Sequence, residues 1–208
     1  MEPLEADLAR ARDLDVANLA DAIESIGFEC TRCGACCKGY LDEDGARDPD
    51  GDPHTATVFP DEVREIRTAT EYDWRDMARP MPYGLAGEGD DATGETFEWA
   101  LQTDDCGDCT FYAEDDAEGR CTVHGDRPLI CRTYPFSVVL GDDGGPSQPM
   151  GSVVDREGSV RAHECEGLGR DISREEAEEL ADALKKRAVR ELEEAIAVRD
   201  RYRPTAPG

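Results

Sequence analysis

The most informative stretch of this sequence is CTRCGACC at residues 30–37, which places four cysteines within eight residues. Two Cys-x-x-Cys steps follow one another, so a single tight turn can direct several sulfurs toward one point. Gly34 permits the positive φ that such metal-binding turns often need. Because consecutive side chains diverge, we expect Cys36 and Cys37 to point in different directions. One of them would then serve a second centre or bridge within a larger cluster.

A second group of cysteines follows: Cys106, Cys109, Cys121, Cys131 and Cys165. Cys131 lies between Arg127 and Arg132, and Pro128 stands where a proline can begin the helical turn that carries this cysteine. A centre with four thiolates is negatively charged, so nearby guanidinium groups would stabilise it. We therefore expect Arg127 or Arg132 to approach the cysteines.

Metal ligation explains nine cysteines better than the other roles of this residue. A single cysteine is most often a small buried hydrophobic residue, a role that does not fit four cysteines so close together. Residues 1–7 carry acids where a secretory signal needs basic residues and an apolar run, and no stretch approaches the roughly 20 apolar residues of a membrane span. We therefore expect a cytoplasmic protein, in which thiols stay reduced. Redox-active thiols or disulfides are the alternative.

The chain is strongly acidic, with 49 Asp and Glu residues against 23 Lys and Arg and a formal net charge of −26. Such a charge repels nucleic acid and anionic membrane surfaces, so we expect neither as a partner. Disorder and adaptation to high salt both produce acidic chains. The acids here are interspersed with Leu, Ile, Val and Trp, which favours a folded, halophilic protein.

The sequence predicts an α+β protein in which a small, loop-rich cysteine core with short strands is flanked by amphipathic helices. Helical spacing and capping signals predict one helix over residues 4–26 that is weakest near Asp15, a short helix from Pro60 through Ile66, and a long helix from a Ser173–Glu176 capping box to about Tyr202. Strands are predicted at 97–101, 137–140 and around 152–154, with a turn at 141–145. The predicted division is an N-terminal helix (1–27), a metal-binding domain (28–170) and a C-terminal helix that packs on it (171–208).

The cysteine motifs resemble those of a known family. The CxxCGxCC box, the C-x11-C spacing from Cys109, the sequence RPLICRTYPF at residues 127–136 and the C-x-G at Cys165 are similar to the YkgJ-type cysteine-cluster family, described as zinc- or iron-chelating. The resemblance runs from Phe28 to about Gly167. It implies eight metal ligands, Cys30, Cys33, Cys36, Cys37, Cys109, Cys121, Cys131 and Cys165. Cys106 and Thr110 depart from the family pattern, so we do not expect Cys106 to bind metal.

Eight thiolates divide into two sets of four, the number that tetrahedral zinc and a [4Fe–4S] cluster both require. The spacing of Cys30, Cys33 and Cys36 is similar to the three-cysteine run of ferredoxins, which slightly favours an iron–sulfur cluster over zinc. No histidine falls at ligand spacing. We expect His124 and His163 at the surface or supporting the ligands by hydrogen bonds.

No nucleotide-binding or catalytic motif accompanies the cysteines. We therefore expect a metal-binding protein with one or two all-cysteine iron–sulfur or zinc centres, in a structural or electron-transfer role and with an unidentified protein or redox partner. The alternative is an iron–sulfur oxidoreductase or a methyl-transfer-related enzyme, since a flagellin lysine methylase carries a related cluster. An open coordination position beside a pocket would favour the enzyme, and a closed thiolate site the binding protein.

Overall fold

The structure, a computed structural model, describes residues 4–39, 54–81, 85–86, 93–94, 98–115, 118–140 and 153–201. The chain forms two compact units. The first consists of Met1–Thr31 and Arg132–Gly208, and the second of Arg32–Cys131. Each unit is described by itself below.

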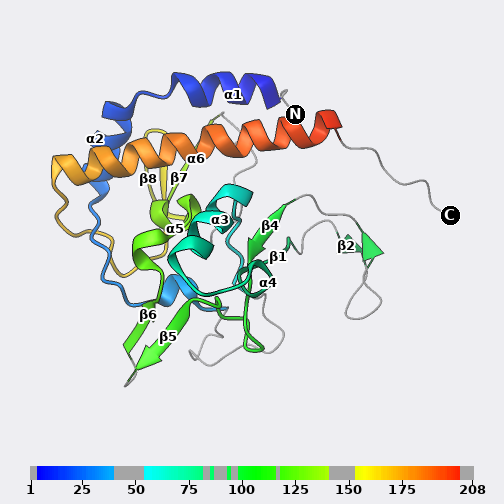
Figure 1. Ribbon diagram of the computed structural model, residues 1–208. Coiled ribbons are helices and arrows are strands. Elements are labelled where there is room, and N and C mark those ends of the chain that lie inside the picture. Colours follow the sequence, from blue (N-terminus) through cyan, green and yellow to red (C-terminus); the bar gives the residue numbers. More distant parts are fainter. Residues whose placement is uncertain are drawn as a thin grey trace. The chain divides into compact units, whose positions relative to one another are not determined.

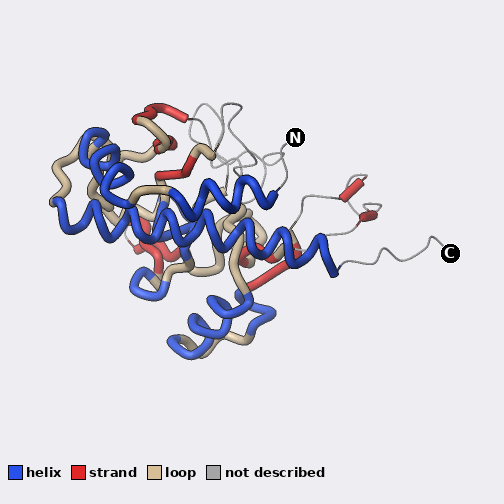
Figure 2. Tube along the Cα trace, turned by 90° about the horizontal axis from the view of Figure 1, so that it is seen from above, coloured by secondary structure: helices blue, strands red, loops and turns tan. Residues whose placement is uncertain are grey.

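The described part of the first unit is built mainly of three helices, α1 (Leu4–Asp13), α2 (Val16–Ile26) and α6 (Arg174–Arg201). Figures 1 and 2 both show α1 running beside the long α6, and α2 also packs against α6. The prediction of one helix over residues 4–26 is wrong, because the helical conformation is interrupted between Asp13 and Val16 and two helices form. Asp15 begins a new helix there, its carboxylate accepting a hydrogen bond from the Asn18 N–H at 3.0 Å.

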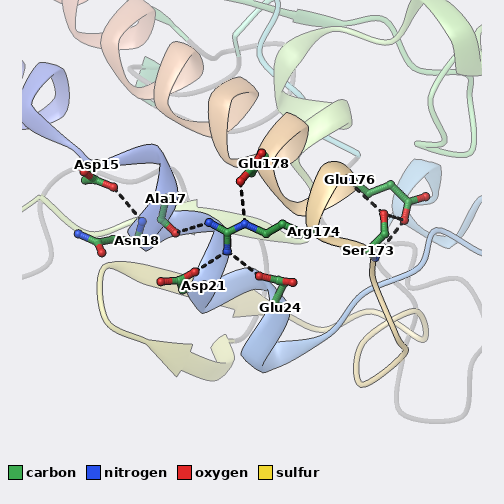
Figure 3. A network of polar contacts seen from close by, with 9 residues as sticks. All are labelled: Asp15, Ala17, Asn18, Asp21, Glu24, Ser173, Arg174, Glu176 and Glu178. Atoms are coloured by element: carbon green, nitrogen blue, oxygen red, sulfur yellow. Dashed lines mark hydrogen bonds and ion pairs between the residues drawn. The ribbon is translucent and has the colours of Figure 1, made fainter.

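The start of α6 is the capping box that the sequence predicted. The Ser173 N–H donates to Glu176 Oε2 at 3.1 Å, and the Glu176 N–H donates to Ser173 Oγ at 3.3 Å. Arg174 follows in the first turn and reaches across to α2, where it pairs with Asp21 and with Glu24, as Figure 3 shows. The cap and these ion pairs anchor the N-terminal end of α6 on α2.

A three-stranded antiparallel sheet completes the first unit, in the order β7 (Phe136–Val138), β9 (Val160–His163) and β8 (Val153–Glu157). The strands predicted near 137–140 and 152–154 are confirmed as β7 and β8, whereas β9 was not predicted; the predicted turn at 141–145 lies outside the described residues. The buried core joins this sheet to α2 and α6. It contains Leu19, Ile23, Phe136, Val160, Ala162, Ala177, Ala181 and Leu184.

In its described residues, the second unit has short helices and three two-stranded antiparallel ladders. The helical elements are the 3-10 turn η1 (Ala35–Cys37), α3 (Pro60–Ala69), α4 (Trp74–Met77) and the 3-10 turn η3 (His124–Asp126); α5 (Leu129–Thr133) continues into the first unit. The ladders pair β1 (Ala78–Pro80) with β4 (Trp99–Leu101), β2 (Leu85–Ala86) with β3 (Thr93–Gly94), and β5 (Tyr112–Asp115) with β6 (Glu118–Cys121). The predicted helix at Pro60 and the strand near residue 99 are both confirmed.

Glu62 connects α3 to the helix that carries Cys131. This side chain is only 6% exposed, and its two oxygens accept hydrogen bonds from the Phe59 N–H and the Leu129 N–H, each at 2.9 Å. The first contact caps α3, and the second satisfies the first N–H of α5. One buried carboxylate therefore fixes the starts of both helices.

The helices and small antiparallel sheets confirm the predicted α+β class. Among the described residues, none of the helices combines the length and the apolar character needed to cross a bilayer.

Candidate metal centre

The CTRCGACC stretch folds into the tight turn that its glycine predicted. Gly34 has a φ of 73°, in the left-handed region, and the Cys37 N–H donates to the Gly34 carbonyl at 2.8 Å to close η1. A Cβ on Gly34 would lie 2.7 Å from the Tyr112 ring and 2.9 Å from the Arg120 nitrogen. Gly34 is therefore required both for its backbone angle and for the close approach of the β5–β6 hairpin.

Backbone contacts bring the second cysteine group to this turn. The Cys109 N–H donates to the Cys37 carbonyl at 2.8 Å, and the Tyr112 N–H donates to the Cys109 carbonyl at the same distance. Tyr112 in turn pairs with Cys121 across the β5–β6 ladder, which is labelled in Figure 1. The CTRCGACC turn and the stretch from Cys109 through the β5–β6 hairpin, which are distant in sequence, thus meet around Cys37.

The Cys37 thiol lies at the middle of this cluster, where it hydrogen-bonds with the thiols of Cys109, Cys121 and Cys36. The prediction that Cys36 and Cys37 diverge is wrong, because the 3-10 turn leaves their sulfurs in contact with one another. These hydrogen bonds, led by the one to Cys109, raise the pKa of Cys37. The hydrogen bond from Cys37 lowers the pKa of Cys109 to about 5 and that of Cys36 to about 7. It also lowers the pKa of Cys121.

Cys131 is the fifth member of the cluster and is carried by α5. Burial raises its pKa, and the nearby sulfurs of Cys109, Cys36 and Cys121 raise it further. Arg127 lies beside these thiols, and its Nη1 donates to the Cys131 carbonyl at 3.3 Å. Its positive charge lowers the pKa values of Cys36, Cys121 and Cys131, which confirms the expected approach of an arginine. Arg132 is exposed and belongs to the first unit.

Cys30 and Cys165 lie in the first unit on two paired segments. Phe28 and Leu168 form an antiparallel bridge, and the Glu29 N–H donates to the Gly167 carbonyl at 3.0 Å. This register sets Cys30 opposite Glu166, the residue next to Cys165. A Cβ on Gly167 would lie 2.3 Å from the Glu29 carbonyl oxygen, so the glycine of the C-x-G motif is needed for the pairing. The pairing lays the segments that carry these two cysteines side by side.

The other two cysteines belong to the second unit. Cys33 is half-buried, and its carbonyl lies where a Cβ on Gly119 would approach to 2.5 Å. Cys106 is exposed, and its N–H donates to Asp104 Oδ1 at 2.8 Å in the loop that leads to Cys109.

His54 is the site residue that the sequence did not predict. Its imidazole hydrogen-bonds to Cys109 and lies near Cys36. The two other histidines occupy different surroundings. His124 is half-buried, and burial followed by the charge of Arg127 lowers its pKa. Of the two positions expected for His163, the surface one is contradicted, because the residue is 4% exposed and its Nε2 is hydrogen-bonded to Ser137 Oγ at 2.8 Å.

The thiols and the imidazole of this cluster are chemically suitable ligands for zinc or iron. Thiolates are the ligands that zinc and iron–sulfur clusters select, and five thiols with one imidazole meet in the second unit. As they lie in the described part of the chain, no three or more His, Cys, Asp or Glu side chains are placed so that together they could hold a metal ion. The sulfurs hydrogen-bond with one another instead, and metal binding would replace these hydrogen bonds with metal–sulfur bonds.

Comparison with protein families matches residues 29–166 to the CxxCxxCC family, described as "Putative zinc- or iron-chelating domain". Comparison with curated proteins and with solved structures found no significant match. The family match spans the greater part of the chain and includes all nine cysteines. This chain therefore belongs to the CxxCxxCC family, and the resemblance drawn from its cysteine motifs is confirmed.

Proposed function

We propose that this protein holds one or two iron–sulfur clusters or zinc ions through cysteine thiolates, in a structural or electron-transfer role. The observation that carries the proposal is the gathering of five thiols in the second unit: Cys36, Cys37, Cys109, Cys121 and Cys131. These cysteines come from three separate segments. Five thiols exceed the four that one tetrahedral ion or one cubane cluster uses, which supports either two centres or a bridging thiolate.

The electrostatics of the cluster support thiolate ligation. A metal ligand must be deprotonated, and the lowered pKa values of Cys36, Cys109 and Cys121 favour the thiolate form of these groups. Arg127 offsets part of the negative charge that would accumulate when Cys37 and Cys131 also lose their protons. The family motif also implies Cys30, Cys33 and Cys165 as metal ligands, and this stays a prediction from the sequence.

The metal itself is best identified on the purified full-length chain. We favour an iron–sulfur cluster, because the spacing of Cys30, Cys33 and Cys36 is similar to that of ferredoxins. Anaerobic purification should then yield protein with bound iron and acid-labile sulfide. Its broad visible absorption should bleach on addition of dithionite. Colourless protein with stoichiometric zinc would reject the iron assignment and retain thiolate ligation, whereas protein that binds neither metal would reject the proposal as a whole.

A further inference from the structure

His54 is held next to the cysteine cluster by hydrogen bonds on both sides of its backbone. Its N–H donates to the Gly107 carbonyl at 2.7 Å, two residues before Cys109. Its carbonyl accepts a hydrogen bond from Arg79 Nη2 at 2.9 Å. These contacts tie the backbone of His54 to the cysteine loop and to strand β1, so its side chain starts from a fixed point beside the cluster.

The imidazole has one nitrogen that the described protein atoms leave unsatisfied. The ring hydrogen-bonds to Cys109 and lies near Cys36. Nε2 is buried and has no hydrogen-bond partner in the part of the chain that the structure describes. Burying a polar atom without a partner is unfavourable, so such atoms in native proteins usually have a partner such as water or a metal ion.

We propose that Nε2 of His54 binds the metal held by Cys109 and its neighbouring cysteines, so that this centre has mixed cysteine and histidine ligation. This inference rests on the proposed function, since it assigns one more ligand to the same site. Imidazole nitrogen is a ligand for both zinc and iron, and three cysteines with one histidine are an established structural zinc set. In iron–sulfur centres, histidine can also replace cysteine as a ligand.

The charge of the site agrees with a neutral ligand. Five thiolates in one cluster would carry a large negative charge, and the positive charge of Arg127 lowers the pKa values of Cys36, Cys121 and Cys131. A neutral imidazole supplies a ligand without adding to that charge. His54 therefore allows the centre to reach full coordination with fewer ionised sulfurs.

Cobalt(II) titration of the reduced, metal-free full chain tests the inference, because Co²⁺ enters thiolate sites and its visible d–d bands shift when nitrogen replaces sulfur. The wild-type protein should show intense sulfur-to-cobalt absorption with d–d bands of mixed sulfur and nitrogen ligation. His54→Ala should weaken cobalt binding by about 10-fold or more. His54→Cys should restore binding with bands shifted to longer wavelength, a result that a purely structural histidine would not give. His124→Ala is the matched control, since His124 is also close in sequence to a cysteine, and it should leave both affinity and spectrum unchanged.

X-ray absorption at the cobalt edge of the wild-type protein provides a test without a substitution. It should detect the scattering of a coordinated imidazole, which is lost in His54→Cys. Wild-type spectra that show sulfur ligation alone, and that do not change in His54→Ala, would overturn the inference and leave the proposed thiolate centre intact. Failure of the wild-type chain to bind cobalt at all would reject the mixed-ligand site, whereas the thiolate centre itself is tested separately by the iron, zinc and sulfide content of the anaerobically purified protein.

Discussion

At the scale of single residues, the backbone angle and the close neighbours of Gly34 leave no room for a side chain at this position of the CTRCGACC turn. Gly34→Ala would combine a strained φ of 73° with contacts of 2.7 Å to Tyr112 and 2.9 Å to the Arg120 backbone. We expect it to destabilise the protein by roughly 1–3 kcal/mol and to lower its metal content. Urea unfolding and metal analysis measure the two effects. Gly125→Ala is the control, because a Cβ there meets nothing within 4 Å; equal behaviour of the two variants would contradict the role of Gly34.

The protonation of Cys37 and Cys131 predicts how metal binding depends on pH. Hydrogen bonds raise the pKa of Cys37 and burial raises that of Cys131, so both thiols are protonated in the metal-free protein at neutral pH. Zinc must displace these protons, and its apparent affinity should therefore increase as the pH rises and fall as the pH is lowered. Titration calorimetry in buffers of different ionisation enthalpy counts the protons released. Zinc binding without proton release would contradict this assignment.

Features of the site that depend on local sequence could be predicted, whereas those that depend on tertiary contacts or on detailed turn geometry could not. The positive φ of Gly34 and the approach of Arg127 follow from local chemistry, so both could be predicted. His54 could not, because it is brought to Cys109 by a tertiary contact, the hydrogen bond from its N–H to the Gly107 carbonyl, which has no sequence motif. The contact between the thiols of Cys36 and Cys37 depends on the 3-10 turn, whose detailed geometry spacing alone does not define.

At the scale of secondary-structure elements, the hydrogen bonds of Glu62 connect α3 to α5, the helix that carries Cys131. Glu62→Ala removes the buried acceptor of the Leu129 N–H at the start of α5, the helix that carries Cys131. We expect a loss of about 1–3 kcal/mol in stability, together with weaker metal binding. Chemical unfolding and competition with a chelator measure these changes. Glu65→Ala, an exposed position on the same helix, should change neither, and a similar effect at both positions would reject the specific link.

The accuracy of the predicted elements follows the strength of their local signals. α3 and α6 carry a proline or a capping box at their first turn, and both were placed correctly. The N-terminal helix was predicted as continuous because its apolar spacing persists through Asp15, although that side chain caps a new helix. Strand β9 was not predicted, because it is short and is defined by its pairing with β7 and β8, which its own sequence does not reveal.

At the scale of the whole molecule, the net charge of −26 predicts a dependence on salt. At low ionic strength the carboxylates repel one another over longer distances, since the screening length increases from about 10 Å at 0.1 M salt to about 30 Å at 0.01 M. We propose that this protein is adapted to high salt. Far-UV circular dichroism should therefore show a loss of structure as NaCl is removed. Sucrose at equal osmolality should not replace the salt, and a fully folded protein in dilute buffer would contradict the proposal.

The central claim, that the gathered cysteines hold a metal, is tested most directly by metal content per chain in two matched variants. Cys37→Ser removes the thiol that contacts Cys36, Cys109 and Cys121, whereas Cys106→Ser alters an exposed cysteine outside the family motif. Each variant is purified anaerobically, checked for native circular dichroism and analysed for iron, zinc and sulfide. We predict that Cys37→Ser loses bound metal, with affinity reduced about 10-fold or more, and that Cys106→Ser retains the wild-type content. Equal metal content in folded samples of both variants would contradict the account.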